Sequence, residues 1–170
     1  MVAERENIQV TEEKELLQQR TQGSRNEMEI VFDAVSCNES FARVAVAAFI
    51  THLNPTLEEL ADIKTAVSEA VTNAIVHGYR KSRGDVELHM KLLEDREVYL
   101  RIKDHGCGIA DITQAMQPLF TTAPEEERAG LGFAVMESFM DKLQVKSAPE
   151  KGTTCLLYTS PSPRDMRRSR

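Results

Sequence analysis

Three polar residues spaced four positions apart, Glu69, Asn73 and His77, are the first candidates for chemistry in this sequence. Residues four apart on a helix lie one turn above another, so these side chains would share one side of a helix. A different side is expected to be buried, because it carries Ile63, Ala66, Val67, Ala70, Ala74 and Ile75. Such a helix can aim a carboxylate and a carboxamide at a ligand, although an ordinary solvated face explains the spacing when it is taken alone.

Two glycine-containing stretches downstream offer nucleotide-binding chemistry. Asp104-x-Gly106-x-Gly108 follows a predicted strand, where a carboxylate can point at an exocyclic amine while the backbone approaches a flat ring closely. Gly130-x-Gly132 opens a predicted helix, where glycine lets the backbone close on phosphates and the helix dipole favours negative charge. Taken singly, a tight turn explains the first stretch and a simple loop-to-helix junction explains the second.

The chain before these stretches is expected to form a strand and then a helix. The sequence from Met28 onward alternates well enough for a half-buried strand. A first helix is predicted over residues 39–53, with Ser36 or Asn38 as its N-cap. Its apolar side is predicted to consist of Phe41, Val44, Ala45, Ala48 and Phe49.

The helix that carries Glu69 has recognisable end signals. Asn54 is a good N-cap and Pro55 suits the first helical position, so the helix is predicted to start there. It is expected to run to His77 and to end at Gly78, which would adopt the left-handed conformation of a C-cap.

Strands dominate the remainder of the ordered chain. Residues 86–93 and 97–103 are predicted to form an antiparallel hairpin. A short helical piece, a further helix and two last strands come next, at residues 111–116, 133–140, 143–147 and 153–157. This order of elements predicts an α+β fold, a two-layer sandwich in which helices cover a mixed, mostly antiparallel sheet.

One domain, residues 27–158, is expected between two tails of different composition. Residues 1–26 have too few large apolar side chains to offset the entropy of ordering, so we expect a disordered extension. Residues 159–170 are rich in Ser, Pro and Arg, and the apolar pattern breaks off abruptly there. We interpret them as a segment foreign to the gene, with a disordered basic tail as the alternative.

Composition excludes several classes of function. The net charge of −6 argues against nucleic-acid binding, because phosphate neutralisation needs a basic surface. Cys37, Cys107 and Cys155 are isolated and odd in number, which fits a reducing cytoplasm and neither a disulfide framework nor a zinc site. The longest apolar run, Val44–Ile50, is far too short to cross a bilayer.

The conjunction of motifs is more specific than any one of them. The helical Glu and Asn, the DxGxG stretch, a long loop and the GxG stretch, in that order, resemble the GHKL superfamily of ATP-binding domains. The resemblance is closest to the anti-sigma F factors of sporulating bacteria and covers roughly residues 25–157. It is carried by residues 38–44, 68–79, 117–122 and 130–141.

The resemblance implies roles for the predicted helix. Asn73 would bind the Mg²⁺ that bridges the nucleotide phosphates, and Glu69 would be the base for the attacking hydroxyl. His77 is a tempting phosphoacceptor, but a histidine at a helix end is more often a capping or packing residue. No metal is expected beyond the Mg²⁺ that the nucleotide carries.

The resemblance also implies a purine site. Asp104 would take the adenine amine, and Gly106 and Gly108 would lie beside the ring. Thr153 or Thr154, from the last strand, would back the adenine.

At the other end of the nucleotide, the resemblance implies a phosphate site with a mobile lid over residues 118–128. Arg128, at the end of this lid, would neutralise charge on the transferred phosphoryl group, with an ordinary solvated cation as the alternative. The implied nucleotide-binding residues are Thr121, Thr122, Gly130, Leu131 and Gly132.

These roles imply a cytoplasmic, ATP-dependent serine kinase that is also an anti-sigma factor. It would sequester a sporulation sigma factor and phosphorylate a serine of a STAS-type anti-anti-sigma protein, with ATP and ADP biasing the choice of partner. The resemblance further implies a homodimer, with no direct contact to nucleic acid or membrane.

Two other functions remain open at this point. One is a nucleotide-gated, sigma-binding module without kinase activity, although Glu69 and Asn73 would be superfluous in a pure binder. The other is the catalytic fragment of a histidine kinase. We disfavour it because residues 1–26 are too short to form the phosphoacceptor helical hairpin that would precede such a domain.

Overall fold

The computed structural model describes residues 25–117 and 131–160 of the chain. Their elements keep the predicted order of strands and helices. They are β1 (Asn26–Asp33), α2 (Cys37–Ile50), η1 (Thr51–Leu53), α3 (Leu57–Thr72), η2 (Asn73–Gly78), β2 (Asp85–Leu92), η3 (Glu94–Arg96), β3 (Val98–Asp104), α4 (Ile112–Ala115), α5 (Gly132–Phe139), β4 (Lys142–Ser147) and β5 (Thr153–Thr159).

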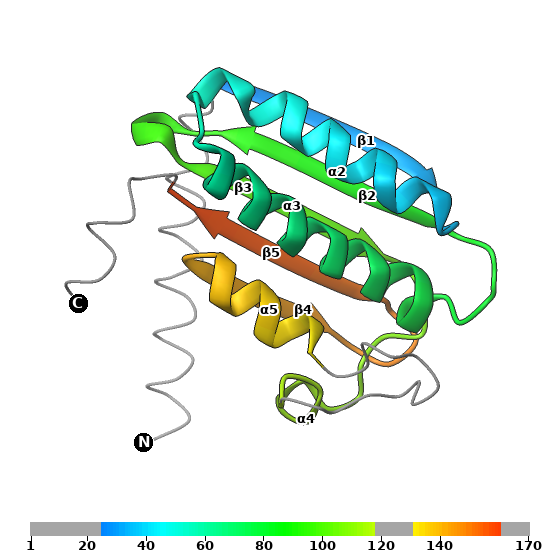
Figure 1. Cartoon of the computed structure of the whole chain (residues 1–170). Coiled ribbons are helices and arrows are strands. Elements are labelled where there is room, and N and C mark those ends of the chain that lie inside the picture. Colours follow the sequence, from blue (N-terminus) through cyan, green and yellow to red (C-terminus); the bar gives the residue numbers. More distant parts are fainter. Residues whose placement is uncertain (1–24, 118–130, 161–170) are drawn as a thin grey trace.

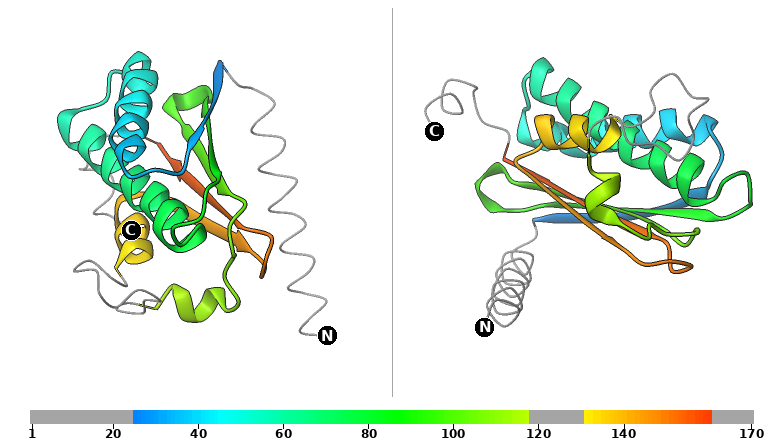
Figure 2. Two further views of the ribbon diagram at one scale, coloured as in Figure 1. Left: turned by 90° about the vertical axis from the view of Figure 1, so that its right-hand side faces the viewer. Right: turned by 90° about the horizontal axis from the view of Figure 1, so that it is seen from below.

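The five strands form one sheet in the order β1-β2-β3-β5-β4, and α2, α3 and α5 cover one of its faces (Figures 1 and 2). The predicted two-layer α+β sandwich is confirmed. The expectation of a mixed sheet is wrong for these strands, because every pair among them is antiparallel. A strand that returns to its neighbour through a short turn pairs antiparallel, as in β2–β3 and β4–β5.

Side chains alternate along each strand, so every second one points toward the helices. On β3 the residues buried under the helices are Val98, Leu100, Ile102 and Asp104. The alternation therefore places a carboxylate at a core position where β3 ends, and Asp104 is only 3% exposed. A buried carboxylate is costly unless partners compensate it, so this position indicates a function.

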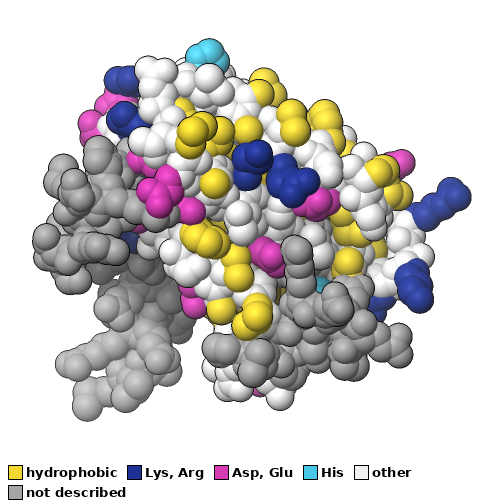
Figure 3. Space-filling view, in the orientation of Figure 1, with side chains coloured by type: hydrophobic (Ala, Val, Ile, Leu, Met, Phe, Trp, Pro, Cys, Tyr) yellow, Lys and Arg dark blue, Asp and Glu magenta, His cyan; other side chains and the backbone are white. Residues whose placement is uncertain are grey.

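Helix α2 buries Phe49 as predicted, but the rest of its core side differs from the prediction. Phe41 is 50% exposed and Val44 64% exposed, whereas the core side consists of Ala42, Val46, Phe49 and Ile50. Both sides of this helix are apolar, so periodicity alone could not choose between them. Apolar side chains accordingly reach the surface over the helical layer (Figure 3).

Helix α3 starts two residues later than predicted. Its N-cap is Thr56, whose hydroxyl accepts from the N–H of Glu59 at 3.2 Å, while the carboxylate of Glu59 accepts from the N–H of Thr56 at 2.8 Å. This reciprocal capping box leaves Asn54 in the left-handed conformation that closes η1, outside the helix. At Asn73 the helix widens into the π-helical turn η2.

The last strand is longer than predicted and reaches Thr159. That residue is 2% exposed, and its hydroxyl donates to the carboxylate of Asp141 at 3.1 Å. The N–H of Ser160 donates to the same oxygen at 2.8 Å. Most of the two predicted tails, residues 1–24 and 161–170, lies outside the described residues.

Candidate nucleotide site

A cavity of about 410 Å³ opens between the end of α3, the end of β3 and the start of α5. Six of the predicted site residues belong to its surroundings: Asn73, Asp104, Gly106, Gly108, Gly132 and Thr153. Its wall is largely apolar, as nucleotide-base sites commonly are, and includes Ala74, Ile102 and Phe133.

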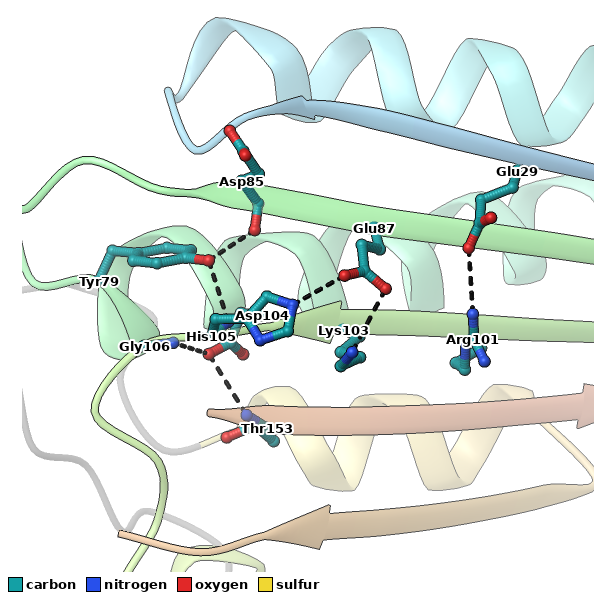
Figure 4. A network of polar contacts seen from close by, with 10 residues as sticks. All are labelled: Glu29, Tyr79, Asp85, Glu87, Arg101, Lys103, Asp104, His105, Gly106 and Thr153. Carbon is teal, nitrogen blue, oxygen red and sulfur yellow. Dashed lines mark hydrogen bonds and ion pairs between the residues drawn. The ribbon is translucent and has the colours of Figure 1, made fainter. Parts of the chain in front are cut away.

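Asp104 is held by backbone donors from two directions. Its Oδ1 accepts from the N–H of Gly106 at 2.9 Å and from the N–H of Thr153 at 3.3 Å (Figure 4). Burial raises the pKa of this carboxyl, and the two backbone donors oppose that rise. A buried carboxylate with one oxygen fixed in this way can use the other to accept from a ligand amine.

Glycines bring the chain unusually close around this carboxylate. A Cβ at Gly78 would lie 2.8 Å from Asp104 Oδ1, and a Cβ at Gly106 would lie 2.1 Å from the carbonyl oxygen of Gly78. The predicted left-handed C-cap at Gly78 is wrong, because the glycines with positive φ in the described chain are Gly108 and Gly152. Gly78 is required for close approach to Asp104 instead.

Ser147, which the sequence did not single out, joins three segments beside the cavity. Its hydroxyl accepts from the N–H of Ile109 at 2.8 Å and donates to the carbonyl of Gly152 at 2.9 Å. The hydroxyl of Thr153 lies 2.9 Å from the same oxygen. These bonds fix the turn after β4 against the segment that comes after β3, and only the folded chain brings them together.

Thr153, rather than Thr154, lies at the end of the cavity where the sequence predicts a purine site. Thr153 lines the cavity and donates its N–H to Asp104, whereas strand alternation points Thr154 to the other face of the sheet. Cys155, the next residue on the cavity side, is buried, and burial raises the pKa of its thiol to about 12. It therefore serves as an uncharged wall of the cavity.

The other end of the cavity is built from α3 and the start of α5. A Cβ at Gly132 would lie 3.1 Å from Glu69 Oε2 and 3.3 Å from Asn73 Oδ1. The fold thus brings the predicted carboxylate and carboxamide together with the second glycine of the GxG stretch. Carboxamide and carboxylate oxygens are ligands that suit Mg²⁺, so the residues present fit a nucleotide-borne ion.

The remaining predicted residues divide into two groups. Leu131 is the N-cap of α5 and is 44% exposed. Four lie outside the described residues: Thr121, Thr122, Arg128 and Gly130. His77 lines the cavity, and its backbone carbonyl accepts from the thiol of Cys107 at 3.3 Å. In the described ranges no helix has the length and hydrophobicity to cross a membrane.

Comparison with known proteins agrees with this geometry. The family model described as the histidine kinase-like ATPase domain matches residues 37–158. This description names an ATPase domain, so the prediction that the domain uses ATP is confirmed.

Two solved structures share the fold. The RsbU and RsbW domains of a Mycobacterium tuberculosis protein match with a TM-score of 0.60 and 22% identity, over 81% of this chain and 33% of that one. The histidine kinase domain of a blue-light activated kinase from Erythrobacter litoralis matches with a TM-score of 0.50 and 19% identity, over 75% of this chain and 63% of that one. At these identities the likeness concerns the fold alone.

Two relatives are much more similar in sequence. The anti-sigma F factor of Bacillus licheniformis is 60% identical over 131 residues, which are 76% of this chain and 89% of the relative. The anti-sigma F factor of Bacillus subtilis strain 168 is 57% identical over 134 residues, 78% of this chain and 91% of the relative. The chain therefore belongs to the anti-sigma F factor family, within the histidine kinase-like ATPases, as its motifs predicted.

Proposed function

We propose that this chain is an ATP-dependent protein serine kinase and anti-sigma factor of the cytoplasm. It holds a sporulation sigma factor and phosphorylates a serine of a STAS-type anti-anti-sigma protein. The observation that carries the proposal is one cavity with a buried carboxylate, Asp104, at one end and Asn73 and Gly132 at the other, with Glu69 next to Gly132.

The purine end supplies recognition. The second oxygen of Asp104 accepts a hydrogen bond from the exocyclic amine of adenine, because the first is already bonded to Gly106 and Thr153. A ligand base that lacks this donor would leave a buried carboxylate without its partner, which costs binding energy.

The phosphate end supplies the chemistry. Asn73 would hold the Mg²⁺ that arrives with the nucleotide, and this ion would neutralise charge on the phosphates. Gly132 leaves space for the phosphates, and the first amides of α5 donate toward them.

Glu69 acts as the general base. The serine hydroxyl of the protein substrate attacks the γ-phosphorus, its oxygen–phosphorus bond forms while the bond to ADP breaks, and Glu69 accepts the hydroxyl proton. In this proposal Arg128 neutralises charge on the transferred group. The resemblance assigns the lid to residues 118–128 and adds Thr121, Thr122, Gly130 and Leu131 as nucleotide-binding residues.

Partner proteins dock on α2. Its outer side exposes Phe41 and Val44, and Arg43, paired with Glu39 at 3.4 Å, lies beside them. An exposed aromatic and aliphatic pair beside an arginine has the composition of a protein–protein interface. The sigma factor and the antagonist are the partners in this proposal, and the active form is a homodimer.

Transfer of labelled phosphate tests the proposal. Purified protein is incubated with labelled ATP, Mg²⁺ and a purified anti-anti-sigma protein, with Asn73→Ala run in parallel. We expect label on a serine of the antagonist and loss of that label in the variant. Tight ATP binding by the unmodified protein without any transfer would contradict the kinase and favour the nucleotide-gated sigma-binding module.

A further inference from the structure

We propose that Tyr79 is a positioning residue for purine recognition: its hydroxyl fixes the chain at His105 and thereby the carboxylate of Asp104. The inference rests on the proposed function, since it takes Asp104 as the residue that binds the purine amine. Tyr79 is itself 7% exposed and lies behind the cavity rather than in its wall.

The hydroxyl of Tyr79 takes the place of one hydrogen bond in the β2–β3 ladder. These strands pair in register up to Val86 and Asp104, so the next pair would be Asp85 with His105. Instead, the hydroxyl donates to the carbonyl of Asp85 at 2.5 Å and accepts from the N–H of His105 at 2.9 Å (Figure 4). The strands thus stay bridged at the point where the ladder stops and the site begins.

The position of this hydroxyl is set by tight packing around the tyrosine. A Cβ at Gly84 would lie 2.0 Å from Cε1 of the Tyr79 ring, so the turn before β2 closes directly on the ring. The hydroxyl of Ser82 donates to the carbonyl of Tyr79 at 2.5 Å. Because both the ring edge and the backbone of Tyr79 are held by neighbouring residues, the position of its hydroxyl is restricted.

His105 transmits this restraint to the site because it lies between Asp104 and Gly106. Its backbone N–H is held by Tyr79, and its side chain lies 2.7 Å from Glu87 on the face of the sheet opposite the helices α2, α3 and α5. The residues on either side of it are the purine-binding carboxylate and one of the two donors to that carboxylate. Removing the hydroxyl leaves the N–H of His105 without this acceptor and loosens the carboxylate.

The variant Tyr79→Phe keeps the ring and removes only the hydroxyl. Its dissociation constants are measured for ATP and for purine riboside triphosphate, which lacks the 6-amino group that Asp104 would bind. We expect about tenfold weaker ATP binding and unchanged binding of the analogue. At saturating ATP the rate of transfer should be retained while KM rises, since the phosphate end is untouched.

Tyr99→Phe is the matched control, because it removes the hydroxyl of a half-buried tyrosine on β3 that is remote from the site. It should leave both constants unchanged. Ser82→Ala is a milder second variant, which loosens the tyrosine but keeps its hydroxyl, and it should weaken ATP selectively by a smaller factor. Thermal unfolding of every variant establishes that it is folded.

Equal weakening of ATP and the analogue would overturn the inference and leave Tyr79 with a general structural role, and no change in either constant would overturn it as well. Asp104→Asn separates this failure from failure of the proposed function. If that variant does not weaken ATP binding more than binding of the analogue, the purine role of Asp104 is wrong. If it does and Tyr79→Phe does not, only the positioning role is wrong.

Discussion

The two ends of the nucleotide cavity differ in the atoms that surround their glycines. At the purine end backbone meets backbone, since the missing Cβ of Gly106 faces a carbonyl oxygen at 2.1 Å and that of Gly108 faces one at 2.0 Å. At the phosphate end the nearest described atoms to the missing Cβ of Gly132 are the tips of two side chains, Glu69 and Asn73, at 3.1 and 3.3 Å. The comparison indicates a rigid end that recognises and an adjustable end that reacts.

The largest effect on ATP binding is expected from Asp104→Asn, which changes the charge at the rigid end. The amide can turn a donor toward the adenine amine and no longer offers a charged acceptor, so ATP should bind about 10- to 100-fold more weakly. Calorimetric titration measures this loss, with Asp111→Asn at the cavity rim as the control.

The same variant should unfold at a higher temperature than the unmodified protein when no nucleotide is present. Burial raises the pKa of Asp104, so the folded state holds its proton more tightly than the unfolded state does. Stability from this group is therefore lost as pH rises through the unfolded and folded pKa values, and it is absent at neutral pH. We expect the unfolding temperature of the variant to be about 2–4 °C higher by scanning calorimetry at pH 7. A lower unfolding temperature would contradict the view that the charged carboxylate costs stability and is retained for function.

Two glycine variants compare the ends directly. Gly106→Ala places a Cβ against the backbone of Gly78, which cannot move without shifting the helix end, and should cost about 1–3 kcal/mol of unfolding free energy. Gly132→Ala meets flexible side-chain tips, so it should leave stability nearly unchanged and lower the rate of phosphate transfer. Denaturant titration of both variants gives the contrast, and equal destabilisation would remove the distinction between the two ends.

The smallest effect is expected from Glu87→Gln, on the face of the sheet opposite α2, α3 and α5, behind the purine end. His105 and, at 3.5 Å, Lys103 lower the pKa of the Glu87 carboxyl, with the hydrogen bond to His105 as the main cause. Its stabilising contribution is therefore present above the unfolded pKa and lost as pH falls through the folded value. The variant should flatten the acid side of the stability profile, measured by denaturant titration from neutral to acidic pH.

The layers and most of the site could be predicted because they depend on local patterns. Alternation located the strands, and the motif spacing located Asp104, Asn73 and Gly132 before any contact was known. The outer side of α2 was misassigned because Phe41 and Val44 recur at helical spacing as core residues do. Their exposure reflects which side meets the sheet, and that is decided by the tertiary structure.

Tyr79 and Ser147 could not be predicted from their neighbours in the sequence. Each acts through a hydroxyl that bonds to backbone groups of other segments, such as the bond from His105, 26 positions from Tyr79. The conformation of Gly78 was misjudged for a similar reason, although the helical stretch of α3 and η2 does end at this residue. Gly78 looks like a helix terminator, but the requirement it meets is set by Asp104 in a different element.

The most direct test of the account compares Glu69→Gln with Asp104→Asn in two measurements, ATP affinity and single-turnover phosphate transfer at saturating ATP. We predict that Glu69→Gln binds ATP normally and transfers phosphate about 10²- to 10⁴-fold more slowly, because only the base is lost. Asp104→Asn should show the reverse, with weak binding and a nearly normal transfer rate once the cavity is filled. Loss of both properties in both variants, or normal transfer by Glu69→Gln, would contradict the division of the cavity into a recognising end and a reacting end.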